Sequence, residues 1–298
     1  MTKLRQFVVC HIHAVIWAFT HIALTTVIAF IWYRRWDLLV VYGTSLVLVT
    51  HIRFRKSQRV IDFFIPALEE LCGGVRIVRE HISESTRPRM YAVHPHGIIA
   101  NGFGFAMQDC VSRGERVSVA ATRWICLLNP LFRWFVNSMG CELISVSKSD
   151  LHRSMRRGDN IAILPGGFEE VLMMEDRRDV VFLRKRSGFL HMASKYGYEV
   201  VPVFLFGESQ LYKNYIMLPS FVKRWSSRLR MPLVIPRGRT FWNFLPSSPR
   251  RGMVIVFGDP VVNNREGDLQ SMHRDYLDII TAIYSKYNPY PEYELTIL

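Results

Sequence analysis

Short apolar runs alternate with helical patterns along the central part of the chain. Apolar runs predict buried strands at 117–121, 142–146, 161–164, 200–206 and 253–257. Apolar side chains at three- and four-residue spacing predict helices at 60–71, 188–196 and 269–287. Residues typical of helix starts and ends predict two more helices, one at 130–139 and one that begins at Ser147 or Ser149 and ends near Gly158. Strands that alternate with helices are typical of crossover connections, so we predict an α/β fold with a mixed sheet flanked by helices.

The first 58 residues have a different pattern. No charged residue occurs from Phe7 to Tyr33, a length of about 25 residues that could cross a bilayer as a helix. A second apolar stretch runs from Leu38 to Ile52. Basic residues flank the outer ends of this pair more than its connecting turn, which favours a cytosolic position for both ends. We predict a membrane hairpin anchor at 1–58 and a globular domain at 59–298.

Two other interpretations of the first apolar segment are a cleaved signal peptide and a re-entrant or interfacial hairpin. A cleaved signal peptide would have a shorter apolar core and a small-residue cleavage site, and the segment has neither. The segment also carries polar side chains that are costly at mid-bilayer depth unless they are partnered, namely His11, His13, Thr20, His21, Thr25 and Thr26. The sequence therefore allows the hairpin either to cross the membrane twice or to re-enter on the same side. It also leaves open whether the hairpin self-associates.

The charge balance is strongly basic, with 38 Lys and Arg against 25 Asp and Glu. Nucleic acid, anionic lipid and a phosphorylated cofactor all suit such a surface. Nucleic acid is disfavoured because the chain has no recognition module and carries an apolar hairpin. The five cysteines show no Cys-x-x-Cys spacing, which argues against a disulfide framework or a zinc ribbon and favours a reducing, cytosol-facing compartment.

The segment His94-Pro95-His96-Gly97 follows a short apolar run, Met90–Val93, that predicts the end of a buried strand. Pro95 cannot donate to a strand ladder and Gly97 tolerates unusual backbone angles, so the strand should end here with a side chain pointing outward. Histidine is well suited to proton transfer near neutral pH. We therefore predict that His96 is a general base, and that His94 either assists it or holds the turn.

Two other kinds of site are disfavoured. Zinc would need further ligands, and the candidates (Cys126, Cys141, His152 and His191) show no ligand spacing, so we predict no metal site. The chain also has no Gly-x-Ser-x-Gly segment of the kind that carries the nucleophile of many serine hydrolases.

Two glycines and two glutamates follow the strand predicted at 161–164. The amides of Gly166 and Gly167 could approach an oxyanion or a phosphate closely. The plainer interpretation is a strand-to-helix turn with solvated carboxylates at the helix start. Beside a histidine at another strand end, however, Glu170 becomes a candidate for orienting the imidazole.

A basic cluster, Arg184-Lys185-Arg186, leads directly into Ser187-Gly188-Phe189, where a helix is predicted to begin. Free amides at a helix start favour an anion there, and the basic side chains would add to the attraction. A solvated or membrane-facing surface is the usual alternative for such a cluster.

Five segments in order resemble the type-2 diacylglycerol acyltransferase family, which includes monoacylglycerol and wax-alcohol acyltransferases. They are His94-Pro95-His96-Gly97, Gly166-Gly167-Phe168-Glu169-Glu170, Arg186-Ser187-Gly188-Phe189, the strand Val201 to Glu208, and Gly258-Asp259-Pro260-Val261. The resemblance covers about residues 85 to 298. It implies an acyltransferase domain at 59–298 with a glycerolipid-acyltransferase-like fold.

The resemblance implies an integral membrane enzyme that transfers a fatty acyl group from acyl-CoA to diacylglycerol and forms triacylglycerol. Its partners would be acyl-CoA as co-substrate, a neutral glycerolipid and the bilayer, with no metal or redox cofactor. The expected location is the endoplasmic reticulum membrane, with the catalytic domain in the cytosol, or a lipid droplet. Monoacylglycerol, a long-chain alcohol or a lysophospholipid stays open as acceptor, and so does a non-catalytic lipid-binding or droplet-coating protein.

The resemblance also assigns roles to particular residues. Related glycerolipid acyltransferases pair their histidine with an aspartate five residues later, where this chain has Asn101, so Glu170 is the expected partner of His96. Arg186, with Arg184 and Lys185, would hold the CoA phosphates. The other residues expected to contact substrate are Pro95, Gly97, Gly166, Gly167, Gly188 and Phe189.

Overall fold

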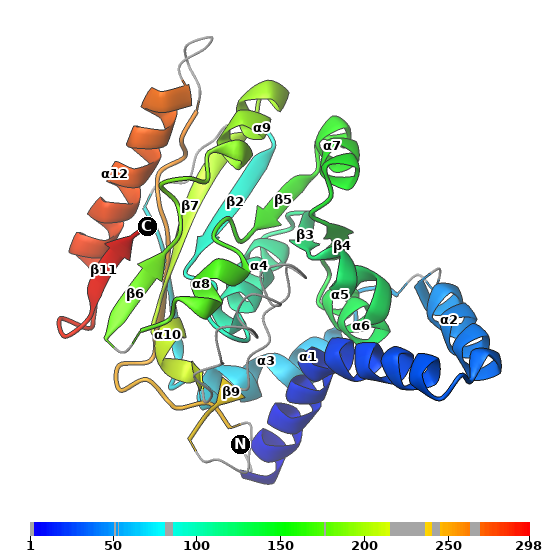
Figure 1. Ribbon diagram of the computed structural model, residues 1–298. Coiled ribbons are helices and arrows are strands. Elements are labelled where there is room, and N and C mark those ends of the chain that lie inside the picture. The colour runs from blue at the N-terminus through cyan, green and yellow to red at the C-terminus, as the bar shows by residue number, and fades with distance from the viewer. Residues whose placement is uncertain are drawn as a thin grey trace.

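A seven-stranded mixed sheet lies at the centre of the computed structural model (Figure 1), in the order β1-β10-β7-β2-β5-β3-β4. The structure describes residues 3–50, 52, 54–80, 86–175, 177–214, 236–239, 245–262 and 269–298. The strands are β1 (Val75–Arg79), β2 (Arg89–His94), β3 (Val117–Ala121), β4 (Glu142–Ser145), β5 (Asn160–Ile163), β7 (Glu199–Phe206) and β10 (Met253–Phe257). All neighbouring pairs are parallel except β10 and β7. The predicted α/β fold with a mixed sheet is confirmed.

Helices cover both faces of this sheet. The first face is covered by α1 (Lys3–Trp32), α3 (Gln58–Leu71), α4 (Asn101–Ser112), α5 (Arg123–Leu128) and α6 (Pro130–Ser138), and the second by α7 (Lys148–Arg157), α9 (Gly188–Tyr196) and α12 (Leu269–Tyr287). The shorter elements are α2 (Trp36–Thr50), α8 (Phe168–Leu172) and α10 (Glu208–Leu211), with two small sheets, β6 (Arg178–Val181) on β11 (Glu294–Ile297) and β8 (Lys213–Asn214) on β9 (Pro236–Arg237). Each face buries its own hydrophobic cluster.

Strand β2 lies between β7 and β5 in the middle of the sheet, so both of its faces are buried. Tyr91 and Val93 enter the cluster of the first face, whereas Met90 and Ala92 enter that of the second. Because side chains alternate along a strand, His94 lies on the second face together with α9 and α12. The strand pattern thus decides which helices can contact this histidine.

Several predicted elements agree with the structure residue for residue. Strands β3 and β10 and helices α9 and α12 have the predicted bounds. Helix α6 begins where the Asn129-Pro130 pair indicated, and Asn129 Oδ1 accepts a hydrogen bond from the Phe132 amide at 2.8 Å. The segment from Pro219 to Arg251 is rich in Pro, Trp and Arg and has no clean period, which predicts an irregular excursion over the domain surface, and most of it lies outside the described residues.

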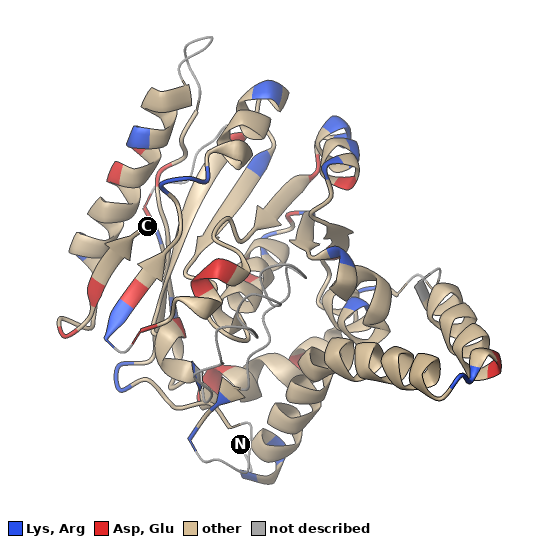
Figure 2. Cartoon of the chain, in the orientation of Figure 1, with Lys and Arg blue, Asp and Glu red and all other residues tan. Residues whose placement is uncertain are grey.

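The two apolar N-terminal stretches form α1 and α2, joined by a short turn (Figure 1). Within the described part of the chain, α1 is the one helix that is long and apolar enough to cross a membrane, and α2 is shorter. Charged residues lie near the beginning of α1 and at the turn between the helices (Figure 2). The division into a hairpin at 1–58 and a domain at 59–298 stays a prediction.

Helix α1 is attached to the rest of the molecule along its first two thirds. It packs against α3, α5 and α6, and buries a row of side chains, namely Val9, Cys10, His13, Ala14, Ile16, Thr20 and Ala23. Asn129 Nδ2, at the start of α6, donates to the Ile16 carbonyl at 2.7 Å and lies 3.0 Å from Thr20 Oγ1. The polar groups of α1 are therefore partly satisfied by the domain itself.

Candidate active site

The ends of two neighbouring parallel strands meet at one edge of the sheet. Strand β2 pairs with β5 in a register that sets Ala92 opposite Ile163. The histidine segment follows β2, and the segment with Gly166 and Glu170 follows β5. Because parallel strands point the same way, the two segments come together although more than seventy residues separate them.

Glu170, in the first turn of α8, is the central group of this site. Its side chain is only 1% exposed. Oε2 accepts a hydrogen bond from the His96 amide at 2.7 Å, and Oε1 accepts one from the Phe182 amide at 3.0 Å. Oε1 also lies 3.5 Å from Nδ1 of His94. One buried carboxylate therefore links both histidines to the chain that follows β6.

The imidazole of His96 is oriented by its own turn, not by Glu170. Nδ1 of His96 lies 2.8 Å from the carbonyl oxygen of Gly97. Since a carbonyl oxygen can only accept, Nδ1 carries the proton and Nε2 keeps its lone pair. This corrects the prediction that Glu170 holds the ring directly, because the contact from Glu170 to His96 is made through the backbone amide.

His96 is half-buried, and its environment suits a base. Burial lowers the pKa of His96 below its ordinary value of 6.5, and this effect outweighs the opposing ones of the Gly97 carbonyl and the Glu170 charge. The imidazole is thus mostly neutral near pH 7. Neutral Nε2 can then accept a proton.

His94 is fully buried and occupies the second face of the sheet. Its Nε2 lies 2.9 Å from the hydroxyl of Tyr276 on α12, while Nδ1 faces Glu170. Burial, followed by the charge of Glu170, raises the pKa of Tyr276 well above its usual value, so the phenol stays protonated and can donate. Tyr276, His94 and Glu170 form a connected series behind His96, which favours a holding role for His94.

Glu208, which was not predicted as a site residue, supports the same turn from the other side. It begins α10 after β7, is 1% exposed, and accepts from the amides of Gly102 at 2.7 Å and Asn101 at 3.2 Å. Burial raises its pKa to about 7, against the effect of these amides. A β-carbon added to Gly97, which has a φ of +63°, would lie 2.4 Å from Glu208 Oε1. The available sequence signal was the segment from Val201 to Glu208, which resembles a family segment and ends on this glutamate, with one residue between it and the strand.

The two glycines after β5 have different roles. A β-carbon at Gly166 would lie 1.8 Å from Glu170 Oε1, so any other residue would displace the carboxylate. The Gly167 amide donates to the Leu164 carbonyl at 3.0 Å within the turn. Gly167 is therefore already engaged, contrary to the expectation that its amide receives an oxyanion, whereas the Gly166 amide donates to none of the described residues.

Only part of the basic cluster Arg184-Lys185-Arg186, which precedes α9, is free to bind an anion. Arg186 forms an ion pair with Glu169 and lies over the ring of Phe182, 5.4 Å from its centroid. Arg184 and Lys185 are exposed, and Gly188 begins α9 as predicted. Phe189 does not face an open site: it is buried, with its ring 5.3 Å from that of Tyr276. Among the described residues, no group of three metal-binding side chains occurs.

Comparisons with known proteins identify the family of the chain. The family model described as "Diacylglycerol acyltransferase" matches residues 29–295. Since this match spans most of the chain, the chain belongs to the diacylglycerol acyltransferase family, as its motifs predicted. It is therefore an acyltransferase, and the histidine segment and Glu170 lie within the matched region.

Relatives with several acceptors resemble the chain to a similar degree. Human 2-acylglycerol O-acyltransferase 1 is 25% identical over 75% of this chain and 73% of its own length. Diacylglycerol O-acyltransferase 2B of Umbelopsis ramanniana is 27% identical (72% and 67%), and human acyl-CoA wax alcohol acyltransferase 2 is 25% identical (72% and 69%). A crystal structure of the 1-acyl-sn-glycerophosphate acyltransferase PlsC from Thermotoga maritima aligns with a TM-score of 0.45 at 12% identity, over 96% of this chain and 99% of that one.

Proposed function

We propose that this chain transfers a fatty acyl group from acyl-CoA to the free hydroxyl of diacylglycerol and so forms triacylglycerol. The observation that carries this proposal is the state of His96. Its Nδ1 donates to the Gly97 carbonyl, its Nε2 has a free lone pair, and its backbone is held by Glu170. Such a group can deprotonate an alcohol at neutral pH.

The proposed reaction takes place in one direct transfer. The acceptor oxygen attacks the thioester carbonyl carbon, a C–O bond forms, and the C–S bond breaks. His96 Nε2 takes the hydroxyl proton and returns it to the departing thiolate, which leaves as CoA. The negative charge of Glu170 stabilises the intermediate imidazolium, and the Gly166 amide is available for the developing oxyanion.

A panel of acceptors tests the substrate assignment. With labelled acyl-CoA and the purified full-length protein, we expect triacylglycerol from diacylglycerol to form faster than products of 2-monoacylglycerol, a long-chain alcohol or a lysophospholipid. The labelled lipids are separated and each product is quantified, and the His96→Ala variant serves as the blank. A faster reaction with another acceptor would replace diacylglycerol. Absence of CoA release with every acceptor would indicate the non-catalytic lipid-binding alternative.

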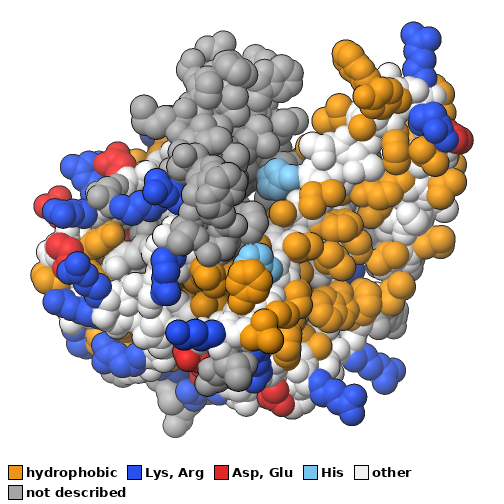
Figure 3. Space-filling view, turned by 90° about the horizontal axis from the view of Figure 1, so that it is seen from below, with side chains coloured by type: hydrophobic (Ala, Val, Ile, Leu, Met, Phe, Trp, Pro, Cys, Tyr) orange, Lys and Arg blue, Asp and Glu red, His pale blue; other side chains and the backbone are white. Residues whose placement is uncertain are grey.

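We further propose that α1 and α2 attach the domain to the cytosolic face of the endoplasmic reticulum as a re-entrant hairpin. Exposed apolar side chains gather on the underside of the molecule (Figure 3). Exposed apolar residues occur on both helices, such as Ile28, Trp32 and Val40, and on the adjoining α5, as Trp124 and Leu127. The contacts of α1 with Asn129 support a position beside the domain and not across the full bilayer.

This membrane position predicts different environments for two introduced cysteines. All five native cysteines are buried, so a fluorescent thiol reagent would label Leu127→Cys on α5 or Arg274→Cys on the opposite face selectively. In bilayers, we expect the Leu127→Cys label to be quenched by nitroxide lipids and protected from iodide, and the Arg274→Cys label to behave in the opposite way. Equal quenching of both labels by iodide would contradict the proposed position of α5.

A further inference from the structure

A basic cavity of about 670 Å³ lies between α7 and α9, on the second face of the sheet. Four positive side chains line it, Arg153, Arg156 and Arg157 from α7 and Lys195 from α9, together with His152 and Tyr196. No residue of the proposed reaction lies among them. The cavity therefore needs an explanation of its own.

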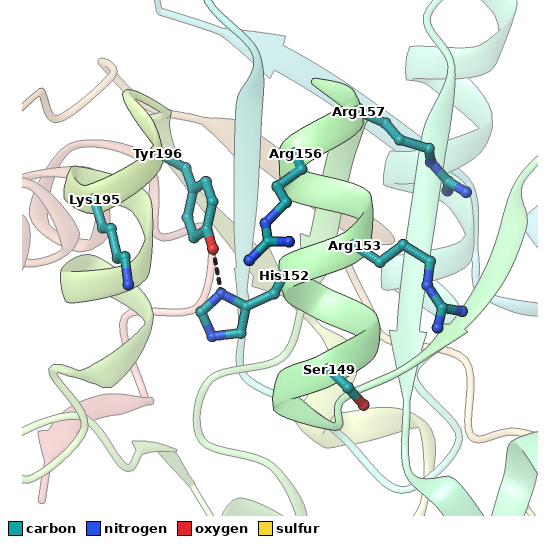
Figure 4. A pocket seen from close by; sticks show the side chains of 7 residues that line it. All are labelled: Ser149, His152, Arg153, Arg156, Arg157, Lys195 and Tyr196. Carbon is teal, nitrogen blue, oxygen red and sulfur yellow. Dashed lines mark hydrogen bonds between the residues drawn. The ribbon is translucent and has the colours of Figure 1, made fainter.

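Its two walls are joined by one side-chain contact. Nδ1 of His152 and the hydroxyl of Tyr196 form a hydrogen bond across the gap between the helices (Figure 4). Figure 4 also shows Arg156 and Lys195 pointing toward this pair from opposite helices, while Arg153 and Arg157 point to the other side. Arg156 and Lys195 thus converge on one position between the helices, beside His152 and Tyr196.

The charges at this position are not internally balanced. Arg153 is 3.7 Å from Asp150, and Arg157 pairs with Asp159 at 2.6 Å and Glu142 at 3.4 Å. Within the described ranges, no carboxylate forms an ion pair with Arg156 or Lys195. Two like charges that point at one position favour an anion with several acceptor oxygens, which is the chemistry of a phosphate group.

The cavity also lies at a suitable distance from the histidines. Helix α9 begins just after Arg186, which contacts Glu169 beside Glu170, and ends at the cavity. Its nine residues span about 13 Å. In CoA, the pantetheine arm separates the thioester from the phosphates, so the phosphates are expected away from His96 and not beside it.

The membrane helices lie elsewhere. In Figure 1, α1 and α2 lie at the lower end of the molecule, where β2 ends, and α7 and α9 lie toward the upper end. A lipid acceptor would reach the histidines from the lower, apolar end. A water-soluble anion would reach the cavity from the upper end, which faces away from α1 and α2 in Figure 1.

We infer that the cavity between α7 and α9 binds the phosphate groups of acyl-CoA, with Arg156 and Lys195 as the principal contacts. The inference rests on the proposed use of acyl-CoA as acyl donor. It moves the phosphate site away from Arg186, whose charge is already paired with Glu169. The pantetheine arm then follows α9 toward His96.

Charge reversal tests this site in the full-length protein. The variant Arg156→Glu with Lys195→Glu should raise KM for acyl-CoA at least about tenfold, since each lost contact is a charged hydrogen bond, and should leave kcat nearly unchanged. KM for acyl-pantetheine, which lacks the nucleotide phosphates, should not change. Arg76→Glu with Arg274→Glu is the matched control, because both residues are exposed and lie outside the cavity.

Direct binding separates this inference from the proposed function. Calorimetry with free CoA should show a Kd at least about tenfold weaker in the cavity variant than in the control, whether or not acyl transfer is detected. Equal CoA affinity in the two variants, or an equal rise in KM for acyl-pantetheine, would overturn the inference. Loss of binding to phosphatidic acid vesicles with CoA affinity retained would also overturn it, and would assign the cavity to a lipid headgroup.

Discussion

His96→Ala should lower the rate of acyl transfer by about 10²- to 10⁴-fold, the usual contribution of a positioned general base. The structure gives this residue one imidazole nitrogen bonded to Gly97 and one with a free lone pair. Alanine removes the proton acceptor and leaves the backbone bond to Glu170 in place. Single-turnover rates with acyl-CoA and diacylglycerol measure the loss, with melting temperatures as a check on folding.

The control for this variant is His11→Ala, since His11 lies on α1, outside the proposed path of acyl-CoA, and its Nδ1 lies 2.7 Å from the Phe7 carbonyl oxygen of the same helix. Its rate should match that of the unmodified protein. The pH profile gives a second check. A base must be neutral, so kcat/KM should fall as the pH decreases through the pKa of His96, and burial sets that midpoint below 6.5. A His96→Ala variant that keeps near-normal transfer would show that another group is the base.

Glu170→Gln should lower kcat/KM by roughly 10- to 100-fold, since the loss of a buried acceptor costs about 1–3 kcal/mol and each 1.4 kcal/mol is tenfold. Both carboxylate oxygens accept from backbone amides, those of the half-buried residues His96 and Phe182. A glutamine has only one such oxygen, so one amide would face an NH₂ group. The backbone of His96 would then shift, and its imidazolium would lose a stabilising charge.

Glu169→Gln is the matched control, because it makes the same change one residue away. Glu169 pairs with Arg186, which is 41% exposed, and such pairs are worth about 0–1 kcal/mol. The pH profile distinguishes positioning from a general loss of structure. The charge of Glu170 raises the pKa of His96, so Glu170→Gln should move the acidic midpoint to lower pH. Equal losses in both variants, or an unmoved midpoint, would remove the proposed role of Glu170.

The elements that could be predicted are those whose signals are local. A fully apolar run identifies a strand such as β10, and Asn129-Pro130 identifies the start of α6 through one cap and one fixed backbone angle. Helix α4 was not predicted, because Gly102 and Gly104 are residues typical of turns. Gly102 is nevertheless needed in this helix, since the side chains of Met253 and Glu208 approach its backbone closely. That requirement depends on contacts that no local pattern contains.

The same limit applies to the site. His96 and Glu170 could be selected because each follows an apolar strand and carries useful chemistry. The atom of His96 that contacts Glu170 could not be predicted, because it is the backbone amide, which every residue except proline has. The sequence pattern makes Tyr276 one apolar position of the helix predicted at 269–287, whereas its contact with His94 depends on both residues lying on the same face of the sheet. Gly166 and Gly167 look alike in the sequence, yet the Gly167 amide donates to the Leu164 carbonyl and the Gly166 amide donates to none of the described residues.

The turn that carries His96 is held from two directions, by Glu170 after β5 and by Glu208 after β7. These strands are the two neighbours of β2. The catalytic turn therefore cannot be completed by β2 alone, nor by any two of the three strands. If His96 is the base, as proposed, acyl transfer requires the three innermost strands to be in place together, and binding of lipid does not.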